Sequence, residues 1–318
     1  MARVRIVLSR KGFDSVSGGC PSPVLPDGSL VSLPIPDERS PVRYGELTWR
    51  GWNLGTLVAA LTGGRHHSGS GAHLDPDVRP GLRPCRRGWR PAFGQLGAAQ
   101  GHLRNQGVGV GDLFLFFGLF RPVDGALRWA GPPLHVFWGW LQVGAVLSVD
   151  DVRARPREHA GLATHPHLSL PRDRSNTLYV AAEALSIPGV STPGFPGAGV
   201  AARFDPELRL TDGGAARPGR WSLPRWFLTA GARPLSYHAA PARWTPAGAR
   251  VQLEAVSRGQ EFVLHDEYRQ AGAWAASLVR RAVSSSGRAR APRRRRPPRR
   301  RRGAPPAARG RRGRPPRS

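Results

Sequence analysis

The sequence predicts an α+β fold: a single domain with a mixed or antiparallel sheet. Strand-like apolar runs and helical patterns are interspersed along the chain, and no strand–helix–strand unit recurs. The 318 residues are also enough to bury a substantial core. We assign the domain to residues 1–283 and expect a disordered Arg/Pro-rich tail at 284–318.

Local patterns place the main elements. Residues 3–8 alternate in polarity as a first strand does, and a short helix is expected around Asn53–Leu61. Apolar residues at helical spacing predict a helix over Gln95–Gln106, which Gly107 ends. The other expected elements are strands at Asp112–Phe120, His135–Val149 and Thr177–Ala182, core segments at Trp221–Leu228 and Gln260–Leu264, and a closing helix at Trp274–Val279.

The order of elements in the middle of the chain resembles that of small PUA-like barrels, which include readers of modified bases. A helix, a Gly–Asp pair, an apolar strand and a glycine-kinked strand follow one another between Gln95 and Val149. A PUA-like barrel portion within the sheet is therefore compatible with the sequence.

Positive charge is concentrated at one end of the chain. Of the formal net charge of +27, 15 units come from arginines in residues 287–318, which contain no acidic residue. Such an arm would bind phosphate polymers with a strong salt dependence, although drift in composition explains it equally well. The tail therefore says little about the activity of the folded part.

Cysteine content and apolar segments predict a bacterial-type cytoplasmic protein without a membrane partner. Only Cys20 and Cys85 are present, so a disulfide framework and a thiolate zinc site are both unexpected. No signal-peptide core follows the N-terminus, and the longest apolar stretch is too short to span a bilayer.

The loop after the first strand is the first candidate site. Lys11 is the only lysine beside 47 arginines, and it lies with Ser9, Arg10 and Asp14 among glycines. Glycines let the backbone approach a ligand, so Ser9, Arg10 and Lys11 are expected to hold a phosphate or another anionic group. An internal Arg10–Asp14 ion pair is the structural alternative.

Histidine and aspartate motifs supply candidate acids and bases. His73 and Asp75 share one face of an extended segment, where they can transfer protons or bind a divalent metal, although Asp75 can equally cap a turn. His165 and His167 form the only His-x-His, but spacing identifies no third ligand, so we assign no metal ligand and leave the cofactor unknown. The predicted catalytic residues are Asp14, His73, Asp75, His102 and His165.

An amide-rich segment precedes the central strands. Gln95, Gln100 and Asn105 each offer a donor and an acceptor, which suits recognition of a base edge. Phe117 and Trp138 lie nearby in sequence and offer faces on which a base can stack, although filling a core is the more common role of such residues.

Several of these segments resemble a bacterial and phage family, the nucleotide modification associated domain, type 3. The resemblance covers roughly residues 3–280 and implies a link to modified nucleotides without fixing a reaction. It rests on Leu8–Ser15, Ser17–Gly19, Pro21–Pro23, Leu33–Pro36, His73–Asp77, Gln95–Gln106, Gly111–Gly118, His135–Gly144, His165–His167, Asn176–Thr177, Pro196–Gly199 and Gly259–Val263.

Three functions are compatible with the sequence and the resemblance. The leading one is a protein that modifies a nucleotide or a DNA base, with DNA or a nucleotide as its partner. The second is a non-catalytic reader of modified DNA, which predicts an aromatic cage near Trp138 or Phe117. The third is a scaffold for other proteins of a DNA-modification system, which predicts a large exposed apolar patch.

Overall fold

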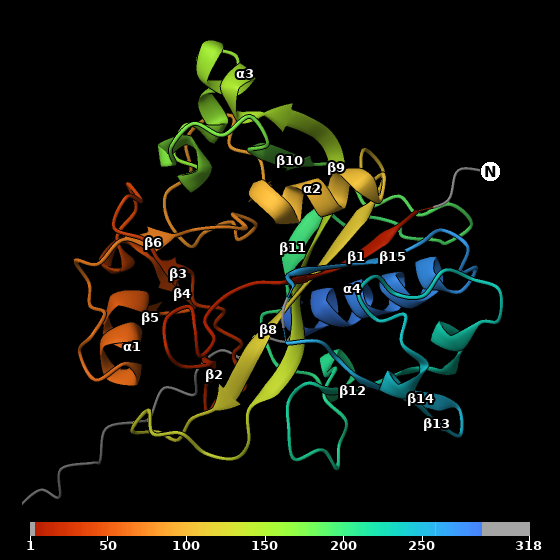
Figure 1. The fold of residues 1–318 in the computed structure, drawn as a ribbon. Coiled ribbons are helices and arrows are strands. Elements are labelled where there is room, and N and C mark those ends of the chain that lie inside the picture. The colour runs from red at the N-terminus through yellow and green to blue at the C-terminus, as the bar shows by residue number, and fades with distance from the viewer. Residues whose placement is uncertain (1–3, 258, 288–318) are drawn as a thin grey trace, which may run out of the picture. The chain divides into compact units, whose positions relative to one another are not determined.

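Two apolar strands that pair in parallel form the centre of the fold in the computed structural model, which describes residues 4–257 and 259–287. Strand β1 (Ile6–Arg10) pairs in parallel with β8 (Leu113–Pro122) and antiparallel with β15 (Glu261–Leu264). The predicted first strand is thus confirmed as an inner strand of a mixed sheet, between β15 and β8 (Figure 1).

The long strand β9 (Leu134–Ser148) extends this sheet in two directions. Its first half pairs with β8, and its second half pairs with β10 (Thr177–Ala181), which in turn pairs with β7 (Ala92–Gln95). The resulting order is β15-β1-β8-β9-β10-β7, with β11 (Ala198–Val200) on β9 and β2 (Ser22–Val24) on β8. The β1–β15 edge and the β7 edge are thereby joined through one continuous strand.

The PUA-like barrel portion with which the order of elements was compatible is not found in the described residues. Within the described residues the eight-stranded sheet stays open, because β15 and β7 end the strand order without pairing to each other. A separate three-stranded sheet, with β14 (Arg250–Glu254) between β12 (Arg220–Pro224) and β13 (Trp244–Ala247), was not predicted. The α+β class is confirmed.

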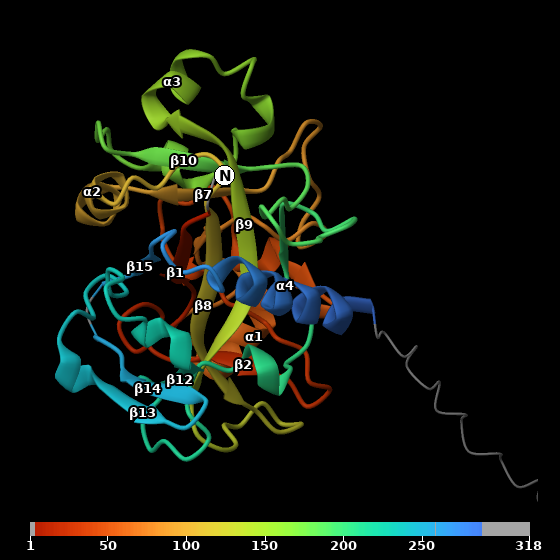
Figure 2. The same cartoon turned by 90° about the vertical axis from the view of Figure 1, so that its right-hand side faces the viewer.

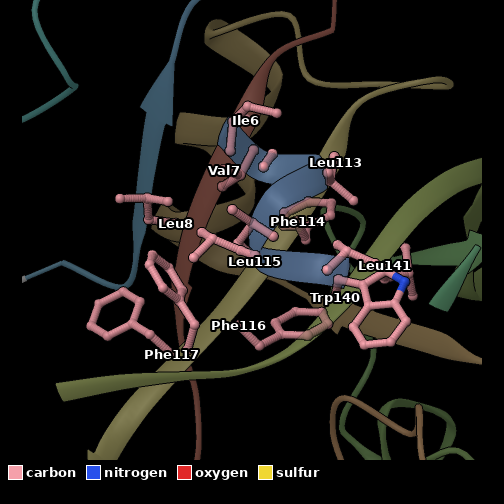
Figure 3. Close-up of a cluster of buried hydrophobic side chains, with 14 of the residues drawn as sticks. Ile6, Val7, Leu8, Leu113, Phe114, Leu115, Phe116, Phe117, Trp140 and Leu141 are labelled. Atoms are coloured by element: carbon pink, nitrogen blue, oxygen red, sulfur yellow. The ribbon is translucent and has the colours of Figure 1, made fainter. Parts of the chain in front are cut away.

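Helices cover the two faces of the large sheet. Helix α4 (Ala271–Gly287) packs against β9, with Leu278 and Val279 near Leu115 and Trp140. Helix α2 (Gly97–Asn105) lies on the other side, where Gln100 bonds to Tyr179 (Figure 2). Figure 3 shows the apolar side chains of β1 and β8 packed side by side in front of α4.

A second apolar cluster forms beside this sheet around helix α1 (Leu54–Leu61). The side chain of Asn53 caps α1 by accepting from Thr56 N, as the predicted helix start requires. Phe13 and Tyr44 are fully buried in this cluster. Its short strands are β3 (Ile35–Pro36) with β6 (Ala72–His73), and β4 (Thr48–Trp49) with β5 (Trp52–Asn53).

Apart from helix α4, the remaining described elements are short. Helix α4 runs to Gly287, past the boundary expected at residue 283, and the rest of the predicted tail, 288–318, lies outside the described residues. Among the described helices none has the length and apolarity needed to cross a bilayer. The short elements are α3 (Val149–Ala154) and the 3-10 turns Tyr44–Glu46, Ala160–Leu162, Pro166–Ser169, Pro206–Leu208, Arg225–Leu228 and Pro241–Arg243.

Candidate functional site

A polar cavity of about 320 Å³ lies where strands β1 and β7 end. Residues 10–17, β6 and the residues after it, β7, the 3-10 turn at 166–169 and the segment before β15 all reach it. Its walls are therefore made by chain segments far apart in sequence. The lining residues are Arg10, Lys11, Gly12, Asp14, Val16, Ser17, Ile35, His73, Asp75, Gly94, Gln95, Leu96, His167, Ser257, Gly259 and Gln260.

Two histidines and a carboxylate form the most concentrated group in this cavity. His73, Asp75 and His167 each offer one ligand atom, and these atoms lie within 4.8 Å of one another. The rings of His73 and His167 have centroids 5.5 Å apart. In the described part of the chain, this is the group of His, Cys, Asp or Glu residues whose spacing suits a metal ion.

Each member of this group is held by a neighbour. His73 Nδ1 lies 3.0 Å from Asp37 Oδ2, and His167 Nδ1 lies 2.6 Å from Asn176 Oδ1. Asp75 Oδ1 accepts a hydrogen bond of 2.7 Å from Gly94 N. The orientation of the three side chains is therefore fixed by neighbouring groups that are not themselves members of the cluster.

Burial and neighbouring charges set the protonation state of two members of this cluster, His167 and Asp75, near neutral pH. Burial lowers the pKa of His167 to about 4, and the opposing charge of Asp75 does not compensate. Burial alone would raise the pKa of Asp75, but hydrogen bonding to His165 and the charges of His167, His165 and His73 bring it to about 2. The cavity thus presents a neutral imidazole at His167 and a carboxylate at Asp75.

Glycine at position 94 is a steric requirement of this arrangement. A Cβ on Gly94 would collide with the ring of His167. The backbone of β7 consequently passes directly beneath the imidazole, and its N–H reaches Asp75 from there.

Lys11 belongs to a second polar group, which lies beside the histidine–aspartate cluster. Its Nζ donates to Glu261 Oε1 at 2.7 Å, and Gln95 Nε2 donates to the same oxygen at 2.8 Å. The ammonium also lies 4.7 Å from the centre of the Phe93 ring. One carboxylate therefore positions both a predicted anion-binding residue and a predicted base-binding residue.

Arg10 and Asp14 have separate partners. The Arg10 guanidinium donates to Val256 O at 3.1 Å and Ser257 O at 2.9 Å, and burial lowers its pKa. Asp14 Oδ1 accepts from Val16 N and Ser17 N, which closes the loop after β1. Within the described residues Arg10 and Asp14 do not form an ion pair with each other, although both line the cavity.

The family of the chain follows from a comparison of its sequence. The model of the family described as nucleotide modification associated domain 3 matches residues 5–265. The chain belongs to this family. No curated protein and no solved structure matches the chain. Every residue that lines the polar cavity lies within the part matched by the nucleotide modification associated domain 3 family.

Five of the predicted site residues do not line the cavity of this family member. Ser9 is fully buried, and Gln100 is buried against Tyr179 OH at 3.0 Å. His102 bonds to Ser236 Oγ at 3.0 Å, and Asn105 is exposed at the end of α2. His165 is buried behind the cluster, with its Nε2 3.3 Å from Asp75 Oδ1.

Four residues important to the geometry were not among the predicted site residues. They are His167, Glu261, Asp37 and Asn176. The His-x-His motif contained a signal for His167, and Glu261 lies in one of the segments on which the family resemblance rests. For Asp37, 36 residues before His73, local spacing offered no signal.

Two other hollows among the described residues are of comparable size. One of about 370 Å³ near α4 and β12 carries Arg209, Arg250 and Arg281 but no histidine in its lining. The other, of about 410 Å³, adjoins the polar cavity, shares Val16, Ser17 and Ile35 with it, and carries Arg65 and His66. The polar cavity is the candidate site because it gathers the titratable groups.

Proposed function

We propose that this protein modifies a nucleotide or a DNA base bound in the polar cavity. The observation that carries the proposal is the convergence of Lys11, Asp14, His73, Asp75, Gln95 and His167 on one cavity from distant parts of the sequence. Groups that can transfer protons lie beside groups that can donate hydrogen bonds, as a reaction on a nucleobase needs. Membership of the nucleotide modification associated domain 3 family agrees with this substrate class.

The partly used amide and ammonium groups suit binding of a polar ligand. Gln95 donates one N–H to Glu261 and accepts from Leu96 N, which leaves a second N–H and a second lone pair. Lys11 likewise has two donors beyond its bond to Glu261. Because Glu261 neutralises the charge of Lys11, we assign Lys11 to hydrogen bonding with a base or sugar as well as to attraction of phosphate.

The adjoining hollow offers a place for phosphate. Arg65 is exposed there, and the described residues make no ion pair with its guanidinium. A nucleotide whose base enters the polar cavity past Val16 and Ser17 would bring its phosphate towards Arg65. Gly19, which has a positive φ, keeps this path open, because an added Cβ there would collide with the Arg65 guanidinium.

Catalysis is favoured over reading of a modified base by the positions of the aromatic residues. Trp138 is 3% exposed and Phe117 is 0% exposed, so both belong to the core. Among the described residues that line the cavity there is no phenylalanine, tyrosine or tryptophan. A reader that stacks its base on an aromatic cage lacks that cage here.

Nucleoside mass spectrometry tests the proposal. DNA and free nucleotides would be analysed from cells that contain the wild-type protein, Lys11→Ala, Asp14→Ala or His73→Ala, with Glu158→Gln as an exposed control. We expect a nucleoside difference with the wild type and the control that the three cavity variants abolish. If the three variants leave both nucleotide binding by the purified protein and the nucleoside profile unchanged, the proposal is wrong.

A further inference from the structure

We propose that His73, Asp75 and His167 bind one divalent transition-metal ion of the zinc or iron(II) class. Two imidazoles and one carboxylate are ligands that such ions prefer, whereas calcium and magnesium prefer oxygen alone. The ligand atoms lie within 4.8 Å of one another and face a cavity from which water or substrate can complete the coordination. This inference concerns the cavity of the proposed function, but metal binding is measurable without a nucleotide.

The hydrogen bonds of His73 fix the nitrogen that is free for the ion. The acceptor at Nδ1 is the carboxylate of Asp37, so Nδ1 carries the proton and Nε2 has the lone pair. A carboxylate that accepts from the far nitrogen of an imidazole is a typical outer partner of a metal-binding histidine.

His167 has the same arrangement with an amide in place of the carboxylate. Asn176 Nδ2 donates to His167 O at 3.2 Å, which fixes Asn176 Oδ1 as the acceptor at His167 Nδ1. The lone pair of His167 therefore lies on Nε2, which is the nitrogen 3.8 Å from Asp75 Oδ2. That separation is too long for a hydrogen bond and leaves both atoms available to a common ion.

Asp75 offers one oxygen and keeps the other for the protein. Its Oδ1 accepts from Gly94 N, and His165 Nε2 lies 3.3 Å from the same atom. His165 Nδ1 accepts from His167 N, so its proton lies on Nε2, facing Asp75. Asp75 Oδ2 makes no hydrogen bond with any of the residues that the structure describes, so it is the oxygen available to the ion. His165 lies against the other oxygen and is therefore a positioning residue rather than a ligand.

When bound, such an ion supplies a Lewis acid in the same cavity that Lys11 lines. Its positive charge would also offset the carboxylates of Asp75 and Asp37, which otherwise face each other across His73. The site would then attract an anionic nucleotide more strongly than Lys11 alone does.

Metal titration of the full-length protein tests the inference. After removal of metal with a chelator, the protein would be titrated with Co²⁺ as a spectroscopic probe and with Zn²⁺, with stoichiometry read from elemental analysis. We expect one equivalent of Co²⁺ with the absorption of a low-symmetry site. His73→Gln, Asp75→Asn and His167→Gln should each abolish that absorption, whereas exposed His67→Ala should retain it.

Outer partners give a graded second test. Asp37→Asn and Asn176→Ala should weaken Zn²⁺ binding by about 10- to 100-fold without changing its stoichiometry. Circular dichroism on every variant shows whether the fold is kept. Wild-type protein that binds no Co²⁺ while folded, or folded ligand variants that bind it as the wild type does, would overturn the inference. Nucleotide binding that persists in the absence of metal binding would leave the proposed function standing.

Discussion

Lys11 Nζ lies 2.7 Å from Glu261 Oε1, across 250 residues of sequence, with the two side chains 9% and 1% exposed. The only lysine of this arginine-rich chain is therefore held by a buried carboxylate. A compact ammonium fits between Glu261 and the face of Phe93. The planar and larger guanidinium of arginine does not place a point charge in the same way.

Removal of one partner of this pair should destabilise the protein. Lys11→Met leaves the Glu261 carboxylate buried without a cation, and we expect a loss of about 3–5 kcal/mol in the free energy of unfolding. Urea denaturation measures it. The double variant Lys11→Met/Glu261→Gln should regain much of this loss, and a double variant no more stable than Lys11→Met would contradict the argument.

Glycine 94 should be essential to the histidine–aspartate cluster. Gly94→Ala places a Cβ against the ring of His167. The ring must then move, and its arrangement relative to Asp75 is lost. We expect loss of Co²⁺ binding together with a lowered melting temperature. Gly101→Ala in α2 is the matched control, because nothing lies within 4 Å of its added Cβ and alanine favours a helix.

Buried neutral histidines away from the cavity should make stability fall in mild acid. Burial, and secondarily the charge of Arg10, lowers the pKa of His135 to about 3, and burial lowers that of His238 to about 4. In the unfolded chain a histidine has a pKa of about 6.5. Below that pH these histidines bind protons in the unfolded state but stay neutral in the folded state. The free energy of unfolding should therefore drop by about 1.4 kcal/mol per pH unit for each histidine between pH 6 and pH 4.5.

Urea denaturation at several pH values checks this dependence. His135→Asn removes one titrating group, and although it also loses the bond from Trp221 Nε1, its stability should change less steeply with pH. An unchanged slope in this variant would show that other groups dominate acid sensitivity.

Arg65 should contribute to binding of a single-stranded oligonucleotide. Arg65→Ala removes one positive charge from the hollow beside the cavity, so the slope of log affinity against log salt should become less steep by about 0.7. Fluorescence anisotropy at several salt concentrations measures the slope. Exposed Arg128→Ala, whose partner is Asp124, should leave it near the wild-type value, and equal slopes in all three proteins would exclude Arg65 from the interface.

Much of the fold could be predicted from local pattern. Alternation located β1, the run of apolar residues located β8, and Asn53 marked the start of α1. The three-stranded sheet of β12, β13 and β14 was missed, because β13 contains Pro246 and alternates only weakly. The order of elements was compatible with a barrel portion, but that order contains no information on whether edge strands meet.

The sequence by itself determined the class of the fold, the family resemblance, and the choice of six residues that line the polar cavity: Arg10, Lys11, Asp14, His73, Asp75 and Gln95. These depend on local order and residue type. Only the tertiary structure brought His167 to His73 and Asp75, and Glu261 to Lys11. Glu261 lies in β15 and Lys11 follows β1, so their contact is set by the pairing and register of two strands far apart in sequence, which the spacing of residues along the chain does not contain.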